Sequence, residues 1–234
     1  MTSPTPQTTP AADPTVAGPG RTLVIDSATE ACSVALFEGE TLLGGEFRVL
    51  GRGHAEALVP MIGALPERGK AQRIVVALGP GSFTGVRVGL AAARALALAW
   101  GAQIEGYSTL ALVAAMARGE GASGPVAVAM TGGHGEWFTQ GFDASGTPLG
   151  ELASLKPADA AATITAAYVA GNQAEALIAL RGNGEAMALL PDARAFGLLP
   201  AAALTDHVRP LYGRAPDARL PGGLLPGEAT PGQS

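Results

Sequence analysis

The sequence is poor in cysteine and aromatic residues and has a small excess of acidic side chains, and these shortages exclude several classes of protein. Cys32 is the only cysteine in 234 residues, so neither an intramolecular disulfide framework nor a thiolate metal cluster can form, and we expect a reducing cytoplasmic location. Fifteen basic against twenty acidic residues give a formal net charge of −5. A chain with this balance is not expected to wrap nucleic acid by its own electrostatics.

Long apolar runs are also missing. No stretch reaches the roughly 18 uninterrupted apolar residues of a membrane span, because Arg87 and Arg94 interrupt the longest candidate. Residues 1–20 contain neither a basic residue nor an apolar run, which is unlike a signal peptide, and we expect no membrane contact. The segments 1–20 and 216–234 are rich in proline and glycine and are predicted to be disordered tails.

Hydrophobic periodicity between the tails predicts an α/β chain. Residues 21–49 have the pattern of three antiparallel strands separated by short turns. Apolar residues at helical spacing predict a helix over 54–65, and the β-branched run 73–78 predicts a strand that is buried on both faces. Another helix over 86–100, a short strand and a third helix complete a unit that ends near residue 120.

The same order of elements restarts after a glycine-rich break at residues 119–124. Three strands again precede a helix, which is predicted over 157–168, and short strands alternating with alanine-rich helices are predicted beyond it. We therefore predict two strand-rich α/β domains that are related by duplication. The first covers residues 21–120, and the second, more degenerate one covers residues 121–215.

The stretch LGPGSFTGVRVG, residues 78–89, raises the question of a phosphate-binding loop. The Walker pattern G-x-x-x-x-G-K-[ST] fails, because the glycines are one residue too far apart and Val86 stands in place of the lysine. The dinucleotide pattern G-x-G-x-x-G fails too, since the spacing is G-x-G-x-x-x-G. Two interpretations remain open: an anion site at a helix N-terminus, or a tight turn into a helix capped by Ser82 or Thr84.

The helix that follows this loop carries a stripe of small residues. Gly85, Gly89, Ala93 and Ala97 succeed one another at i+4 spacing, and Ala92 widens the stripe. Such a surface lets another element approach closely, either a second chain or the domain's own sheet. We predict a partner interface here. The other residues of this predicted interface are Arg87 and Arg94 at its rim, and Leu58 and Met61 on the preceding helix.

Three motifs in order carry a resemblance to a known family. They are LVIDSATEACSVALFEGE from Leu23, GHAEALVPMI from Gly53, and VALGPGSFTGVRVGLAAARALA from Val76, which is followed by GYSTLALVA. These stretches resemble the bacterial TsaB (YeaZ) family over residues 21–114, and GEWFTQGF and PLYGRAPDA are further remnants. The resemblance implies the two-lobed α/β fold of actin and Hsp70.

In function, the resemblance implies a role in adding threonylcarbamoyl to the adenosine beside the anticodon of tRNA. Members of this family are non-catalytic and pair with TsaD, which carries the metal and the transferase chemistry, while TsaE is a nucleotide-dependent third subunit. Alone, they form homodimers through helices of the first lobe. The resemblance thus implies indirect contact with tRNA, no catalytic residue in this chain, and an adenine nucleotide, if any, at the junction with TsaD.

The residues agree with a non-catalytic role. A TsaD-type metal site resembles two histidines one helical turn apart, but Leu58 occupies the fourth position after His54, so no such site forms. Actin-like ATPases position phosphates with an acidic residue and a glycine-hydroxyl turn after the first strand. Asp26 and Thr29 lie at that place, yet Ala28 replaces the glycine. In the second half, Thr131 and Gly133 stand where relatives have an aspartate and an arginine.

Two other functions are left as alternatives. An ATP-using enzyme of the actin-like group, such as a small-molecule kinase or ATPase, would use the candidate nucleotide-binding residues Asp26, Thr29, Ser82 and Thr84. A peptidase would need the missing pair of histidines or a catalytic triad. Ser82 has no histidine or acid nearby in the sequence to complete a triad.

Overall fold

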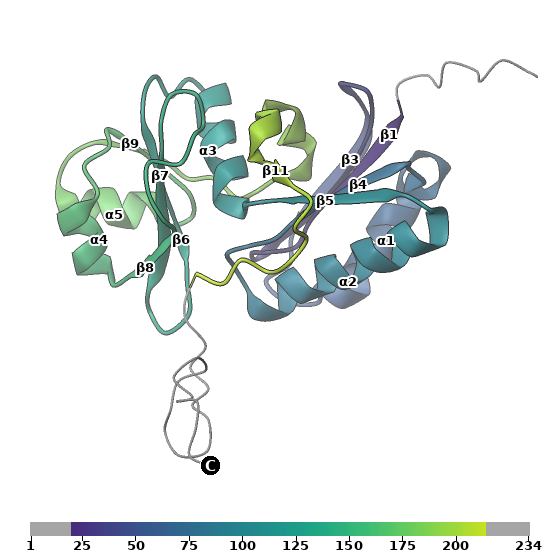
Figure 1. Ribbon diagram of the computed structural model, residues 1–234. Coiled ribbons are helices and arrows are strands. Elements are labelled where there is room, and N and C mark those ends of the chain that lie inside the picture. The colour runs from purple at the N-terminus through teal and green to yellow at the C-terminus, as the bar shows by residue number, and fades with distance from the viewer. Residues whose placement is uncertain (1–19, 214–234) are drawn as a thin grey trace, which may run out of the picture.

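The computed structural model describes residues 20–213, which form two lobes side by side, each built on one mixed β-sheet (Figure 1). The strands are β1 (Arg21–Asp26), β2 (Ala31–Glu38), β3 (Thr41–Val49), β4 (Arg73–Ala77), β5 (Gln103–Tyr107), β6 (Val126–Thr131), β7 (Trp137–Phe142), β8 (Ala153–Leu155), β9 (Tyr168–Ala170), β10 (Glu185–Met187) and β11 (Leu204–Thr205). The helices are α1 (His54–Ala64), α2 (Phe83–Trp100), α3 (Thr109–Gly119), α4 (Pro157–Thr163) and α5 (Ala174–Arg181), with 3₁₀ turns at Pro66–Gly69, Ala193–Leu198 and Ala201–Ala203. Apart from Gly20, the two predicted tails lie outside the described residues.

The two sheets have the same topology. In the first lobe, β2 and β3 extend one side of β1 in antiparallel fashion, and β4 and β5 extend the other side in parallel. Around β6 in the second lobe, β7 and β8 are the antiparallel neighbours, and β9 and β10 are the parallel ones. The repeated order confirms the predicted duplication and the two-lobed actin-like fold class.

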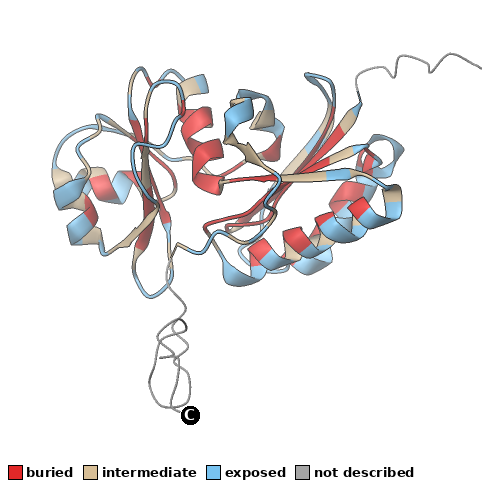
Figure 2. Cartoon of the chain, viewed as in Figure 1, coloured by how far each residue is buried: buried red, intermediate tan, exposed pale blue. Residues whose placement is uncertain are grey.

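Apolar runs place the core of the first lobe as predicted. Leu23, Val24 and Ile25 of β1 and Ile74 of β4 are fully buried, because helices α1 and α2 cover one face of the sheet and other segments cover the opposite face (Figures 1 and 2). Residues 54, 58, 61 and 62 of α1 are buried at helical spacing. Leu58 and Met61 therefore belong to the chain's own core, and their assignment to a partner interface is wrong.

Helix α2 packs its stripe of small residues on the chain's own sheet. Gly85, Gly89, Ala93 and Ala97 are buried, and a side chain at Gly89 would come within 2.6 Å of the Ser27 hydroxyl and 3.6 Å of a methyl group of Val76. Glycine and alanine are needed because the helix backbone lies so close to the sheet. The prediction that these four residues contact a partner is wrong, and the alternative, the domain's own sheet, is confirmed.

By length and composition α2 is the one helix of the described residues that could cross a membrane. Helices of this kind also cover the sheets of proteins that lie outside membranes, and α2 packs on β4 along its small-residue stripe. Arg87 and Arg94 lie on its exposed side.

Helix α3 joins the two lobes and is buried between them (Figure 2). Leu110, Val113 and Ala114 belong to the core of the second lobe, whereas Leu112 belongs to the core of the first. An almost uninterrupted apolar sequence is therefore required, because both sides of this helix face protein.

The end of the described chain returns to the first lobe. Ala193 is part of the first-lobe core, and β11 pairs with the edge strand β5. Residues 206–213, here called the C-terminal strap, then run along α2, and the Leu211 amide donates to the Leu78 carbonyl at 2.8 Å. The predicted second lobe, 121–215, must therefore be shortened, because most of the chain after about residue 192 packs on the first lobe, although Leu199 also contacts the second-lobe core.

Two helices predicted in the second half are shorter or absent. Helix α4 ends at Thr163 instead of continuing to residue 168, since Thr163, Ile164 and Thr165 form a β-branched run that disfavours helix. In the alanine-rich stretch after Met187, which Pro191 and Pro200 interrupt, the helical segments are only short 3₁₀ turns, at Ala193–Leu198 before Pro200 and at Ala201–Ala203 after it.

Candidate functional site between the lobes

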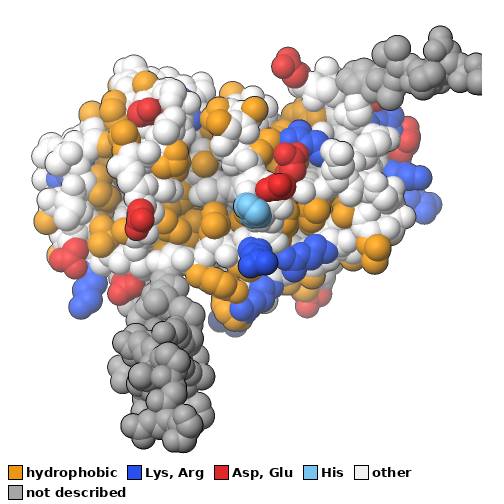
Figure 3. All heavy atoms as spheres, in the orientation of Figure 1, with side chains coloured by type: hydrophobic (Ala, Val, Ile, Leu, Met, Phe, Trp, Pro, Cys, Tyr) orange, Lys and Arg blue, Asp and Glu red, His pale blue; other side chains and the backbone are white. Residues whose placement is uncertain are grey.

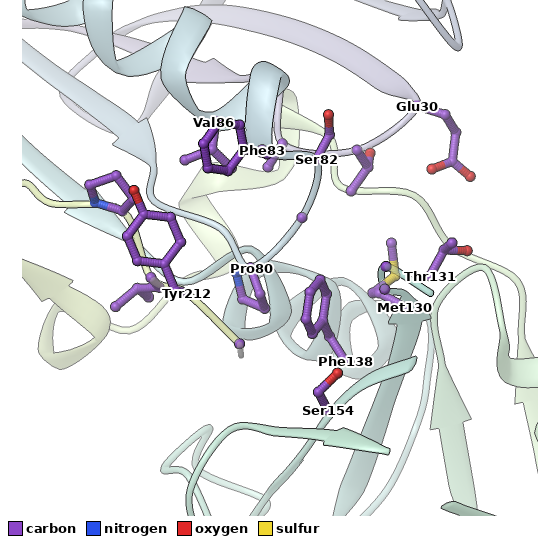
Figure 4. A pocket seen from close by; sticks show the side chains of 18 of the residues that line it. Glu30, Pro80, Ser82, Phe83, Val86, Met130, Thr131, Phe138, Ser154 and Tyr212 are labelled. Carbon is purple, nitrogen blue, oxygen red and sulfur yellow. The ribbon is translucent and has the colours of Figure 1, made fainter. Parts of the chain in front are cut away.

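A pocket of about 640 Å³ opens between the two lobes, where the turns at the ends of β1, β4 and β6 face one another (Figure 4). Apolar side chains form most of its wall, and Phe138, Met130 and Pro80 lie around its centre. The other lining residues are Ala28, Thr29, Glu30, Gly51, Gly81, Ser82, Phe83, Val86, Arg87, Thr131, Gly132, Gly133, Ser154, Asn172 and the strap residues Pro210, Leu211, Tyr212 and Gly213. Its volume is that of a site for a small molecule.

The turn after β1 packs against the glycine-rich loop that borders this pocket. The Ser82 amide donates to the Ala28 carbonyl at 2.6 Å, and the Ser27 hydroxyl donates to the Gly85 carbonyl at 2.9 Å. The Ser82 hydroxyl caps α2 by accepting from the Gly85 amide at 3.2 Å. Internal partners thus occupy amide groups that a phosphate would need. Of the two interpretations of this loop, the tight turn capped by Ser82 is confirmed.

Asp26 is buried behind the pocket and does not line it. The Tyr107 hydroxyl donates to its Oδ2 at 2.9 Å, and the Ala28 amide donates to its Oδ1 at 3.0 Å. Burial raises the pKa of the Asp26 carboxyl to about 7, more than these hydrogen bonds lower it. Because both oxygens are engaged and covered, the carboxyl cannot reach a metal or phosphate in the pocket.

Asp26→Asn is expected to remove a pH dependence of stability. The wild-type carboxyl has a pKa of about 7 in the folded state and about 3.9 in the unfolded state. Between these values the folded state binds more protons, so the free energy of unfolding falls as pH rises from about 4 to 7. Asparagine retains an oxygen but cannot ionise. Urea unfolding at several pH values should show the fall, at most about 4 kcal/mol, in the wild type only; an equal fall in the variant would contradict this role.

The four candidate nucleotide-binding residues are not brought together. Thr29 and Ser82 line the pocket, whereas Asp26 and Thr84 do not. The Thr29 hydroxyl oxygen accepts from the Ala31 amide at 3.2 Å, as expected for a turn residue. With the acid sequestered and the loop amides occupied, the pocket does not fit the phosphates of a nucleotide.

The charges at this pocket are engaged in contacts within the chain. Glu30 accepts a hydrogen bond from the Asn172 side chain at 2.7 Å, which links the two lobes at the pocket edge. Asn172 also accepts from the Thr131 amide at 2.8 Å. On the first lobe, Arg87 donates to the Tyr212 hydroxyl at 2.9 Å. The sequence missed Asn172 and Tyr212 as site residues, because nothing local marks a residue whose partner lies more than 100 positions away.

The histidines form no metal centre in the part of the chain that the structure describes, where no group of three or more metal-ligating side chains is found. His54 is buried, and its Nε2 lies 3.3 Å from the Ala31 carbonyl oxygen. It therefore holds the start of α1 against β2.

A second candidate site is the exposed face of helices α1 and α2. Leu98 of α2 is 88% exposed, more than any other large apolar residue of the described chain, and Val59 of α1 is 64% exposed. Ala91 and Ala95 lie on the same side of α2 and are also exposed. This surface, here called the α1–α2 face, replaces the predicted partner interface. It lies on the opposite side of α2 from the stripe of small residues.

The repeated sheet topology and the pocket between the lobes define the class of this protein: a two-lobed α/β protein of the actin-like type. The family model that describes TsaD, tRNA N6-adenosine threonylcarbamoyltransferase, matches residues 48–194, which is more than half of the chain. TsaB from Escherichia coli, a tRNA threonylcarbamoyladenosine biosynthesis protein, is 38% identical over 146 residues, which cover 58% of this chain and 63% of that protein. TsaB from Bacillus subtilis is 32% identical over 103 residues, or 41% of this chain and 44% of that protein.

Solved structures agree with this match. YeaZ from Pseudomonas aeruginosa superposes with a TM-score of 0.70 at 28% identity, covering 82% of this chain and 99% of that one. A second Pseudomonas aeruginosa structure, described as an uncharacterized protein with similarity to peptidase YEAZ, gives a TM-score of 0.71 at 27% identity, covering 83% and 99%. The chain therefore belongs to the TsaB/YeaZ family. Its matches span less than two thirds of the length of the TsaB relatives.

Proposed function

We propose that this chain is a non-catalytic subunit in the biosynthesis of threonylcarbamoyladenosine in tRNA, and that it acts by binding a TsaD-type transferase. The observation that carries the proposal is the exposed apolar α1–α2 face. Leu98 lies on the side of α2 that also carries the exposed Ala91 and Ala95, with Arg94 one turn before it, and Val59 is exposed on the neighbouring helix α1. A stable interface of this kind buries about 1,200 to 2,000 Å².

The pocket between the lobes supports a role without catalysis. Asp26, the acid behind it, is covered and accepts a hydrogen bond from Tyr107, and amides of the glycine-rich loop donate within the chain. A hydrolase or kinase of the actin-like group needs groups that hold phosphates and a metal ion. The alternative function, an ATP-using small-molecule kinase or ATPase, therefore has little support from the geometry, although Thr29 and Ser82 do line the pocket.

The same proposal includes the assembly states implied by the family. The α1–α2 face would pair with a second copy when the chain is alone and with a TsaD-type partner in the complex, while a TsaE-type subunit would join through that complex. Any adenine nucleotide would then bind at the junction with TsaD. Equilibrium dialysis tests this by comparing nucleotide binding to the complex with nucleotide binding to each subunit alone. A cytoplasmic location fits these partners.

Reconstitution tests the proposed function. Threonylcarbamoyl transfer to tRNA is measured with the cognate TsaD and TsaE proteins, with and without this chain. Activity that depends on this chain, together with no ATP turnover by the chain alone in the presence of Mg²⁺, is the expected result. Full activity without this chain would overturn the proposal, and ATP turnover by the purified chain would favour the kinase or ATPase alternative.

A further inference from the structure

Exposed aromatic and arginine side chains gather where the C-terminal strap meets the first half of α2. Phe83 is 64% exposed and Tyr212 is 56% exposed, and their ring centroids lie 6.5 Å apart with an interplanar angle of 31°. The Arg87 guanidinium lies 3.0 Å from the Phe83 ring centroid and 5.9 Å from that of Tyr212. Large rings left this open to water need an explanation, because the fold does not use most of their surface.

Two more arginines lie along the same line. Arg94 stands two turns further along α2 and donates to the Val208 carbonyl of the strap at 2.7 Å. Arg209 is exposed on the strap itself. None of the three arginines forms an ion pair with any residue in 20–213, and Asp206 is the single acid of the strap. Figure 3 shows basic side chains gathered over α2 and its neighbouring segment, with hydrophobic side chains between them and the second lobe.

We infer that this arginine–aromatic cluster, made of Phe83, Arg87, Arg94, Arg209 and Tyr212, binds single-stranded RNA. The arginines contact backbone phosphates, and the exposed rings stack on an unpaired base. The inference deepens the proposed function, on which it rests for the identity of the RNA, and replaces the expectation that this chain meets tRNA only indirectly. The net charge of −5 is a sum over the whole chain, so it does not reveal a local cluster of positive charge.

The combination of rings and cations favours RNA over an acidic protein. Every base has a flat face that stacks on aromatic rings, and arginine binds phosphate and also stacks. An acidic protein segment would use the arginines but would leave Phe83 and Tyr212 exposed. Both rings also line the mouth of the pocket between the lobes, so a base turned out of a loop has apolar space beside it.

Binding is measured by fluorescence anisotropy with the full chain and two labelled RNA probes. One probe is a short single strand, and the other is a hairpin with a loop of about seven unpaired nucleotides, like an anticodon loop. Duplex RNA of the same length and polyglutamate serve as comparisons. We expect the single strand and the loop to bind more tightly than the duplex, with affinity falling steeply between about 50 and 200 mM salt. Equal binding of polyglutamate and RNA would overturn the inference in favour of an acidic partner.

Substitutions separate the two kinds of contact. Arg209→Gln should weaken binding and reduce the slope of log affinity against log salt by about 0.7, the value for one phosphate contact on a single strand. Phe83→Leu and Tyr212→Leu should weaken binding by roughly 5- to 100-fold with the slope unchanged. Tyr212→Phe retains the ring and loses only the hydrogen bond to Arg87, so it should bind like the wild type.

The matched control is Arg68→Gln, at an exposed arginine in the turn after α1, which should leave both affinity and slope unchanged. Wild-type binding that is absent, or that responds equally to Arg68→Gln and Arg209→Gln, would overturn the inference. Circular dichroism of each variant checks that the fold is retained. The outcome is independent of the reconstitution assay: a chain that binds RNA but is dispensable for transfer would refute the proposed function alone.

Discussion

Gly85→Ala is expected to lower the free energy of unfolding by about 3 kcal/mol, a large fraction of the roughly 5 to 15 kcal/mol by which a native domain is stable. A methyl group at this position would overlap the carbonyl oxygen of Ser27, which is backbone and cannot rotate away. The Ser27 hydroxyl also donates to the Gly85 carbonyl, so the two segments cannot separate without losing a buried hydrogen bond. Urea unfolding followed by circular dichroism measures the loss.

Gly63→Ala is the matched control for this substitution. Gly63 is an exposed residue of α1, and a methyl group there would meet nothing within 4 Å. Alanine should raise the free energy of unfolding by about 0.5 to 1 kcal/mol, because glycine costs conformational entropy inside a helix. If Gly85→Ala were as stable as the wild type, the close packing of α2 on the β1 turn would be refuted.

A bulky residue in the glycine stripe is consequently a test of folding and says nothing about partners. Leucine at Gly89 would meet the Ser27 hydroxyl and Val76, and leucine at Ala93 would enter a site with no exposed surface. The residues of this stripe are small because the backbone of α2 lies close to the sheet. Partner binding must be tested on the other side of α2.

Local patterns predicted the elements of the first lobe, and physical reasons explain why. The LVI and IVV runs are apolar on successive residues, as strands covered on both faces must be. The broken glycine spacing excluded the two standard phosphate-binding patterns, and of the two interpretations that it left open the structure shows the turn capped by Ser82. The restart of the element order predicted the second sheet, whose topology repeats the first.

The sequence did not determine which side of α2 faces the sheet. Residues 85, 89, 93 and 97 form one small-residue stripe, and residues 91 and 95 belong to another, so the composition of the helix marks neither as the buried side. Only the positions of Leu98 and the arginines distinguish them, since long polar or large apolar residues do not fit against a close sheet. A lone exposed leucine is also common on surfaces, so this signal was weak.

The sequence also did not predict the contacts between distant segments of the chain. Arg87 and Tyr212 are separated by 125 positions and Glu30 and Asn172 by 142 positions, and no periodicity connects residues that far apart. The return of the strap to the first lobe therefore went unpredicted, although the PLYG motif that carries Tyr212 was visible. The pocket wall and the arginine–aromatic cluster both depend on that return.

Leu98→Arg is expected to abolish binding to a TsaD-type partner, with an affinity loss of at least about 100-fold. Leu98 is the most exposed large apolar residue of the α1–α2 face, so a partner helix would bury it, and an arginine there would bring an unpaired charge into an apolar contact. The folded chain itself should be unaffected, because the side chain contacts mostly water. Co-purification and analytical ultracentrifugation measure binding to the partner and to a second copy.

Leu180→Arg on α5 provides the comparison that gives this result meaning. Leu180 is 58% exposed and lies on the second lobe, away from the α1–α2 face, so the same change of charge and size should leave both assemblies intact. Adding Val59→Arg to Leu98→Arg should remove any remaining association, since Val59 is exposed on α1, which packs beside α2. If Leu98→Arg binds the partner as the wild type does while Leu180→Arg does not, the interface lies on the second lobe, and the role assigned to the α1–α2 face falls with it.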